Sequence, residues 1–155
     1  MSIDNYGWLK EIYKNIDFDK LPHGIIISGS KGLGKRRLAN EIATKILSKK
    51  LDSNELALIN SNNHPDFFKL DKEKILLHHI TYRKHKWDDE KGHRNVNDFL
   101  SVTPSISNNK VALILNAQTM NAECQNALLK SLEEPAKNTF IIIVTDRNKS
   151  LLDTI

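Results

Sequence analysis

Blocks of apolar residues recur along the chain and predict strands that alternate with helices. Three short, mostly apolar runs are typical of strands buried on both faces: Gly24 to Ser28, Lys110 to Asn116 and Thr139 to Thr145. Elsewhere apolar residues recur every three or four positions, and this predicts helices at Tyr6 to Ile16, Lys35 to about Ser48, Leu51 to Ile59, Gly92 to Val102 and Asn121 to Glu134. The alternation predicts an α/β domain with a mostly parallel central sheet flanked by helices.

The same spacing predicts which helix faces are buried. In the first helix Trp8 and Tyr13 share the apolar face with Leu9, so we expect these aromatic side chains in the core. For the last complete helix the residues expected to point inward are Ala122, Leu128, Leu129 and Leu132. The segment from 64 to 70 is expected to be a turn that enters a strand, and a further helix is expected to begin at Lys149.

The stretch Asp71 to Glu90 has no clear period and is rich in lysine and histidine. Its histidines, His78, His79 and His85, lack the ligand spacing of a known zinc site, so we expect a solvated hairpin or insertion and no metal centre. A nucleic-acid-binding surface is an open alternative here, because the basic and aromatic residues from Arg83 to Trp87 can stack on bases or bind phosphates.

Composition narrows the class of protein. The chain has 155 residues, which suits one domain, and a net charge of +4, which permits contact with nucleic acid without demonstrating it. A single cysteine, Cys124, excludes an intrachain disulfide and fits a reducing compartment. We find no apolar stretch of membrane-spanning length and no secretory pattern, so we expect a cytoplasmic protein without membrane contact.

The first predicted strand runs into a glycine-rich segment with the spacing Gly-x-x-x-x-Gly-Lys. This is the pattern of a phosphate-binding loop, in which backbone N–H groups and the start of a helix surround an anion and the lysine reaches the terminal phosphates. The candidate nucleotide-binding residues are Gly29, Ser30, Lys31, Gly32, Leu33, Gly34, Lys35 and Arg36.

Two positions that normally serve Mg²⁺ are altered. The residue after the loop lysine should be Ser or Thr, whose hydroxyl binds Mg²⁺, but it is Arg36. The second apolar strand of a phosphate-loop enzyme ends in Asp, often followed by Glu, where this chain has Leu115 and Asn116. We therefore predict a degenerate site that binds ATP or ADP, if at all, without hydrolysis. An active ATPase with an irregular metal site is the alternative.

The run from Asn126 to Pro135 resembles the signature of bacterial clamp-loader subunits of the AAA+ superfamily. The order of other landmarks, such as His64-Pro65-Asp66 and Met120-Asn121, is also similar to that group and extends the likeness over nearly the whole chain. The resemblance implies a three-layer P-loop NTPase (AAA+, RecA-like) fold over residues 1–155, as the N-terminal part of a longer three-domain subunit. The four-cysteine zinc module of many members is absent from this sequence.

The resemblance also implies roles and partners. Thr145 would take the sensor position that faces a nucleotide phosphate, and an arginine that completes a neighbour's ATP site would follow Ile155. Candidates for contact with subunits or DNA are Lys130, Glu133 and Glu134. The implied partners are other clamp-loader subunits (gamma or tau, and delta), the sliding clamp and primer-template DNA. The implied function is to help load the clamp for DNA polymerase III during DNA replication. No catalytic residue, metal or other cofactor is expected in the chain itself.

Overall fold

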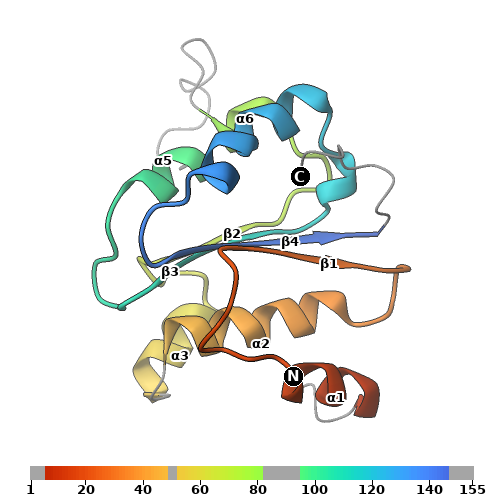
Figure 1. Ribbon diagram of the computed structural model, residues 1–155, viewed down its shortest axis with the longest axis vertical. Coiled ribbons are helices and arrows are strands. Elements are labelled where there is room, and N and C mark those ends of the chain that lie inside the picture. Colours follow the sequence, from red (N-terminus) through yellow and green to blue (C-terminus); the bar gives the residue numbers. More distant parts are fainter. Residues whose placement is uncertain (1–5, 49–51, 82–94, 147–155) are drawn as a thin grey trace.

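Four parallel strands form the centre of the molecule (Figure 1). A computed structural model describes residues 6–48, 52–81 and 95–146. The strands are β1 (Gly24–Ser28), β2 (Phe67–Leu70), β3 (Lys110–Ile114) and β4 (Thr139–Thr145), and their order in the sheet is β1-β4-β3-β2. Since all pairs are parallel, the carboxyl ends of the strands meet at one edge, where open α/β sheets bind ligands.

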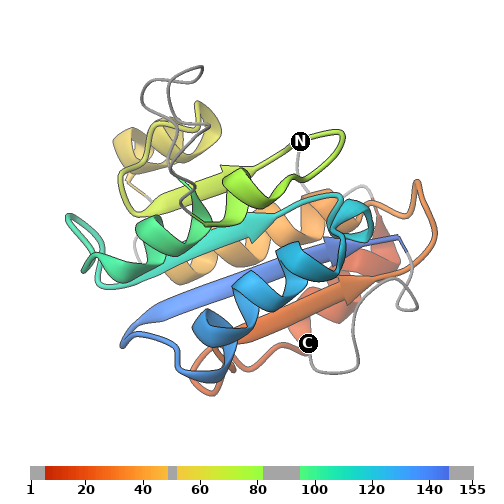
Figure 2. The ribbon, with the colours of Figure 1, turned by 90° about the horizontal axis from the view of Figure 1, so that it is seen from above.

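Helices cover both faces of this sheet (Figures 1 and 2). One face carries α1 (Gly7–Lys14), α2 (Lys35–Leu47) and α3 (Ser53–Asn60). The opposite face carries α4 (Leu77–Ile80), α5 (Val96–Ser101) and α6 (Ala122–Glu133). The three layers confirm the predicted α/β architecture with a parallel sheet.

The central strand β3 divides the core into two halves. Every residue of β3 is buried, and successive side chains point to opposite faces. Val111 and Leu113 join the cluster beneath α2, whereas Ala112 and Ile114 join the cluster beneath α5 and α6. A strand buried on both faces has to be almost wholly apolar, which is why its position could be predicted from the sequence.

The prediction that β1 is buried on both faces is wrong. It lies at the edge of the sheet among the described strands, its residues alternate between exposed and half-buried, and Ile26 is 43% exposed. Two predicted helix faces also need correction. Trp8 is 44% exposed, because Leu9 is the one buried residue of α1. In α6 the prediction is confirmed for Leu128, which is buried, whereas Leu129 and Leu132 are half-buried and Ala122 is exposed, because the helix turns Cys124 inward in its first turn.

The prediction of a solvated insertion at 71–90 is wrong for its first half. Ile75 and Ile80 are fully buried, and His79, in α4, is 8% exposed. Its ring Nδ1 accepts a hydrogen bond from the Leu76 N–H at 2.9 Å, so it has a structural role in starting the helix. The predictions for Arg83 to Trp87, including His85, and for a helix from Lys149 lie outside the described residues.

A buried carboxylate fixes the loop that leads into β3. Asp66 is fully buried, and its oxygens accept backbone N–H bonds from Ser105, Ile106 and Ser107 at 2.6, 2.8 and 2.7 Å. Burial alone would raise the pKa of Asp66, but these three donors outweigh it and hold the pKa below the usual value. The carboxylate thereby ties the start of β2 to the start of its neighbour β3.

Candidate phosphate-binding site

The predicted phosphate-binding loop lies at the carboxyl edge of the sheet, between β1 and α2. Gly32 and Gly34 have φ values of +87° and +81°, which residues with a side chain rarely adopt. A Cβ at Gly34 would lie 2.8 Å from Cδ1 of Leu9, so α1 packs directly against the end of the loop. The glycines therefore serve both the turn and the close approach of a helix.

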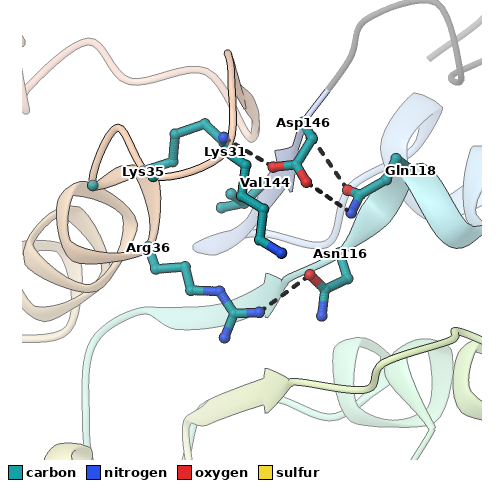
Figure 3. Close-up of a pocket in the computed structure, with 9 residues that line it drawn as sticks. Lys31, Lys35, Arg36, Asn116, Gln118, Val144 and Asp146 are labelled. Atoms are coloured by element: carbon teal, nitrogen blue, oxygen red, sulfur yellow. Dashed lines mark hydrogen bonds and ion pairs between the residues drawn. The ribbon is translucent and has the colours of Figure 1, made fainter.

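A pocket of about 290 Å³ opens beside this loop (Figure 3). The loop and α2 supply one wall, and the residues after β3 and at the end of β4 supply the other. Its lining residues are Lys31, Gly32, Gly34, Lys35, Arg36, Asn116, Gln118, Val144 and Asp146. Three of these side chains are cations and one is a carboxylate, so the lining side chains carry more positive than negative charge.

Lys35 is held inside the loop by three acceptors. It is 7% exposed, and its Nζ donates to the carbonyl oxygens of Gly29 and Ser30 at 2.7 Å each. Nζ also lies 2.9 Å from Oδ1 of Asp146 in an ion pair. Because an ammonium group has three N–H donors, these contacts account for all of them.

Gln118 holds Asp146 in place for that ion pair. Its Nε2 donates to Oδ2 of Asp146 at 3.3 Å, and its Oε1 accepts from the Asp146 N–H at 3.2 Å (Figure 3). We did not predict either residue from the sequence. The available signal was position, since Asp146 directly follows β4 and Gln118 follows β3 by a few residues, both at the ligand-binding edge.

Arg36 connects α2 to the ends of two strands. Its Nη1 donates to both carboxylate oxygens of Asp71, at 3.2 and 3.1 Å, and its Nη2 donates to Oδ1 of Asn116 at 3.1 Å. Asn116 has a left-handed backbone, with φ of +56°, and its Nδ2 donates to the Lys72 carbonyl at 2.9 Å. Arg36 and Asn116, two of the three residues that depart from the nucleotide-site pattern, are thus hydrogen-bonded to each other.

The residues at this site do not fit Mg²⁺, which the P-loop fold class implies. Mg²⁺ requires oxygen ligands in octahedral geometry. Arg36 offers a guanidinium group where the loop should offer a hydroxyl, and Leu115 is fully buried in the core where a carboxylate should be. Among the residues that the structure describes, Asp146 is the one carboxylate that lines the pocket, and it is paired with Lys35.

The structure separates the remaining predicted site residues from this pocket. Thr145 is fully buried beside the loop, paired in register with Ser28, but it is absent from the pocket lining. Lys130, Glu133 and Glu134 are exposed at the far end of α6. That end lies toward the amino edge of the sheet, since the neighbouring Leu132 side chain approaches Gly24 at the start of β1. Their suggested contacts stay predictions.

The parallel sheet, the glycine loop at its carboxyl edge and the helix that follows define a P-loop domain of the AAA+ class. A family model described as DNA polymerase III, delta subunit, matches residues 6–155, and the chain belongs to that family. This confirms the resemblance to clamp-loader subunits at the level of the family.

Individual relatives agree with the family match. DNA polymerase III subunit delta′ of Pseudomonas aeruginosa is 29% identical over 98% of this chain and 46% of its own length. The delta′ subunit of Haemophilus influenzae is 30% identical over 97% of this chain and 46% of its own length. DNA polymerase III subunit gamma of Buchnera aphidicola subsp. Schizaphis graminum is 30% identical over 91% of this chain and 38% of its own length.

A solved structure supports the fold alone. The gamma subunit-related protein of Thermotoga maritima superposes with a TM-score of 0.61 at 23% identity, over 95% of this chain and 42% of that one. The chain also spans less than half the length of the delta′ relatives named above.

In the part of the chain that the structure describes, no helix is long and apolar enough to cross a membrane.

Proposed function

We propose that this chain is the P-loop domain of a delta′-type clamp-loader subunit, which helps place the sliding clamp on primed DNA without hydrolysing ATP itself. Its partners would be the gamma or tau and delta subunits, the clamp and primer-template DNA, in the cytoplasm. The domain would be the N-terminal part of a longer, three-domain subunit. Family membership supports the assignment to the polymerase complex.

The observation that carries the proposed lack of hydrolysis is the bond between Arg36 and Asn116. Phosphoryl transfer at a P-loop needs Mg²⁺ to bridge the β- and γ-phosphates and needs a positioned water. In this site the metal-binding hydroxyl and carboxylate are replaced by a guanidinium and a buried leucine. The subunit would instead place a charged group at the ATP site of a neighbouring subunit, across the interface between them, and so stabilise charge that develops during hydrolysis there.

Reconstitution tests the assignment to the complex. Full-length protein that contains this chain should co-elute with the gamma and delta subunits of its own cell in gel filtration and should be required for clamp loading. Mg-ATP hydrolysis by the complex should be unchanged by Lys35→Ala in this subunit. Failure to join the complex would contradict the proposal.

A turnover-competent ATPase is the second candidate, and two observations favour it. The loop keeps its glycines, and Lys35 lies in it beside an open pocket, as a working site requires. The gamma-subunit relative is also about as similar to the chain as the delta′ relatives are. Phosphate release from Mg-ATP by the full-length protein alone, abolished by Lys35→Ala, would support this candidate.

A further inference from the structure

We propose that a second pocket, at the amino edge of the sheet, receives one large apolar side chain of a partner protein, from a segment in which an acidic and a basic residue flank that side chain. This amino-edge pocket has a volume of about 340 Å³ and lies between the segment before β1, the end of α2 and the starts of β3 and β4. The inference goes beyond the proposed function, because the glycine loop lies at the opposite end of the parallel strands (Figure 1).

The inner walls of the amino-edge pocket are apolar. They are formed by Phe18 and Leu21 before β1, Ile46 in the last turn of α2 and Phe140 at the start of β4. Ile46 is buried, whereas the other three residues are half-buried, so part of their apolar surface faces solvent. Removal of that surface from water would favour the entry of an apolar side chain.

Contacts within the domain hold these walls in place. Asn109 donates from Nδ2 to the Ile46 carbonyl at 2.9 Å, which fixes the loop before β3 against the end of α2. The Phe140 ring stacks on His23 with 5.4 Å between the ring centres, and the His23 Nδ1 donates to the Thr139 carbonyl at 2.7 Å. Because the walls are already ordered, binding would cost little conformational entropy on this side of the interface.

Two opposite charges at the rim are available to a partner. Lys45, in the last turn of α2, and Asp19, before β1, are exposed and line the pocket. Within the part of the chain that the structure describes, neither side chain forms an ion pair or a hydrogen bond. The Lys45 ammonium would attract an acidic residue, and the Asp19 carboxylate would attract a basic one. This arrangement favours a segment whose apolar residue lies between residues of opposite charge.

The same features favour a protein segment over a free small molecule. Pockets for small ligands enclose most of the ligand surface and begin at about 300 Å³. The amino-edge pocket is close to this lower limit, and three of its four apolar walls are partly exposed. A single side chain fits such a space, while the rest of its segment lies on the surrounding surface and reaches the charges at the rim.

An NMR titration of the full-length protein, with labelled methyl groups, tests the inference. The probe is the peptide acetyl-Glu-Gly-Phe-Gly-Lys-amide, and the control peptide has Ser in place of Phe. The first peptide should shift the methyl signals of Leu21 and Ile46, which line the pocket. The control peptide should bind about tenfold more weakly or worse, because it lacks the apolar side chain.

A pair of lysine variants tests the charge at the rim. Lys45→Glu should weaken binding of the first peptide about fivefold, because an exposed ion pair is replaced by repulsion. The matched control is Lys14→Glu, which makes the same change at an exposed lysine in the last turn of α1, outside the pocket lining. It should change the affinity by less than about twofold.

Three results would overturn the inference. Equal binding of the two peptides would show that no apolar side chain enters the pocket. Equal effects of Lys45→Glu and Lys14→Glu would show that the rim charge does not select the partner. Leu21 and Ile46 signals that do not respond to the first peptide would show that the pocket does not receive such a segment, whether it is closed or is already filled by another part of the chain or by a second copy.

Discussion

Arg36 shows how far a single residue could be interpreted from sequence. The sequence identified it as a departure from the metal-binding pattern, because the loop spacing fixes which position should carry a hydroxyl. Its partners were not predictable, since Asp71 lies 35 residues away and Asn116 lies 80 residues away along the chain. Contacts at such separations depend on strand order, which a local pattern does not specify. The same reason explains why Asp146 was missed.

Asp146→Asn tests whether this carboxylate competes with a ligand for Lys35. The amide is a weaker acceptor and carries no charge, so ADP affinity in EDTA should rise about threefold to tenfold. Stability should fall by about 1 kcal/mol or less, because Asp146 is partly exposed. Calorimetry measures the ADP affinity, and thermal melts measure the stability.

Asp19→Asn, at an exposed site, controls for the change in net charge. Unchanged or weaker ADP binding by Asp146→Asn would contradict competition.

Asp66→Asn tests the buried carboxylate that holds the 105–107 loop. The amide has one acceptor oxygen for three N–H donors, so the free energy of unfolding should fall by about 2 kcal/mol, as measured with urea. Asp19→Asn should have little effect. A loss as small as that of the control would show that the carboxylate contributes nothing.

The pH dependence of Asp66 follows from the direction of its pKa. Its folded-state pKa is lowered, so its stabilisation is fully present above the unfolded pKa of about 4. It is lost as the pH falls from there through the lower folded-state value. The wild-type protein should therefore lose more stability than Asp66→Asn in this acid range, and parallel losses would contradict the assignment.

At the scale of elements, sequence predicted the central parts best. The strand β3 lies between two strands and is buried on both faces, and the helix α2 packs one apolar face against β1, β3 and β4, so their apolar residues map directly onto burial. The peripheral elements β1 and α1 were predicted in place but with the wrong exposed side chains, since within the described part of the chain β1 pairs with one strand and α1 buries one residue. An apolar face predicts that a helix or strand forms, whereas the elements that pack against it determine how much of that face is buried.

The packing of α1 on the glycine loop gives an element-scale prediction. Gly34→Ala should cost about 1–2 kcal/mol for its positive φ and more for the clash with Leu9. Gly32→Ala is the matched control, because it has a similar φ but no atom within 4 Å of the new Cβ. We expect a clearly lower melting temperature for Gly34→Ala than for Gly32→Ala. Equal melting temperatures would show that α1 does not restrain the loop.

For the whole molecule, the sequence predicted the layer architecture and the family. Alternating strands and helices indicated a parallel sheet covered on both faces, and the order of motifs indicated the clamp-loader group, which the family match confirms. The spatial order of the strands, β1-β4-β3-β2, was not predicted. That order brings the loop after β1 next to the end of β4, and so it creates the pocket that Lys35 and Asp146 share.

The central claim is that this P-loop domain cannot organise Mg²⁺ and water for hydrolysis. The most direct measurement is a single-turnover assay in which full-length protein, in excess over radiolabelled ATP, is incubated with Mg²⁺ in the absence of other subunits. We predict phosphate release at the rate of the protein-free blank, for the wild type and for Lys35→Ala alike. Release above the blank that disappears with Lys35→Ala would contradict the account.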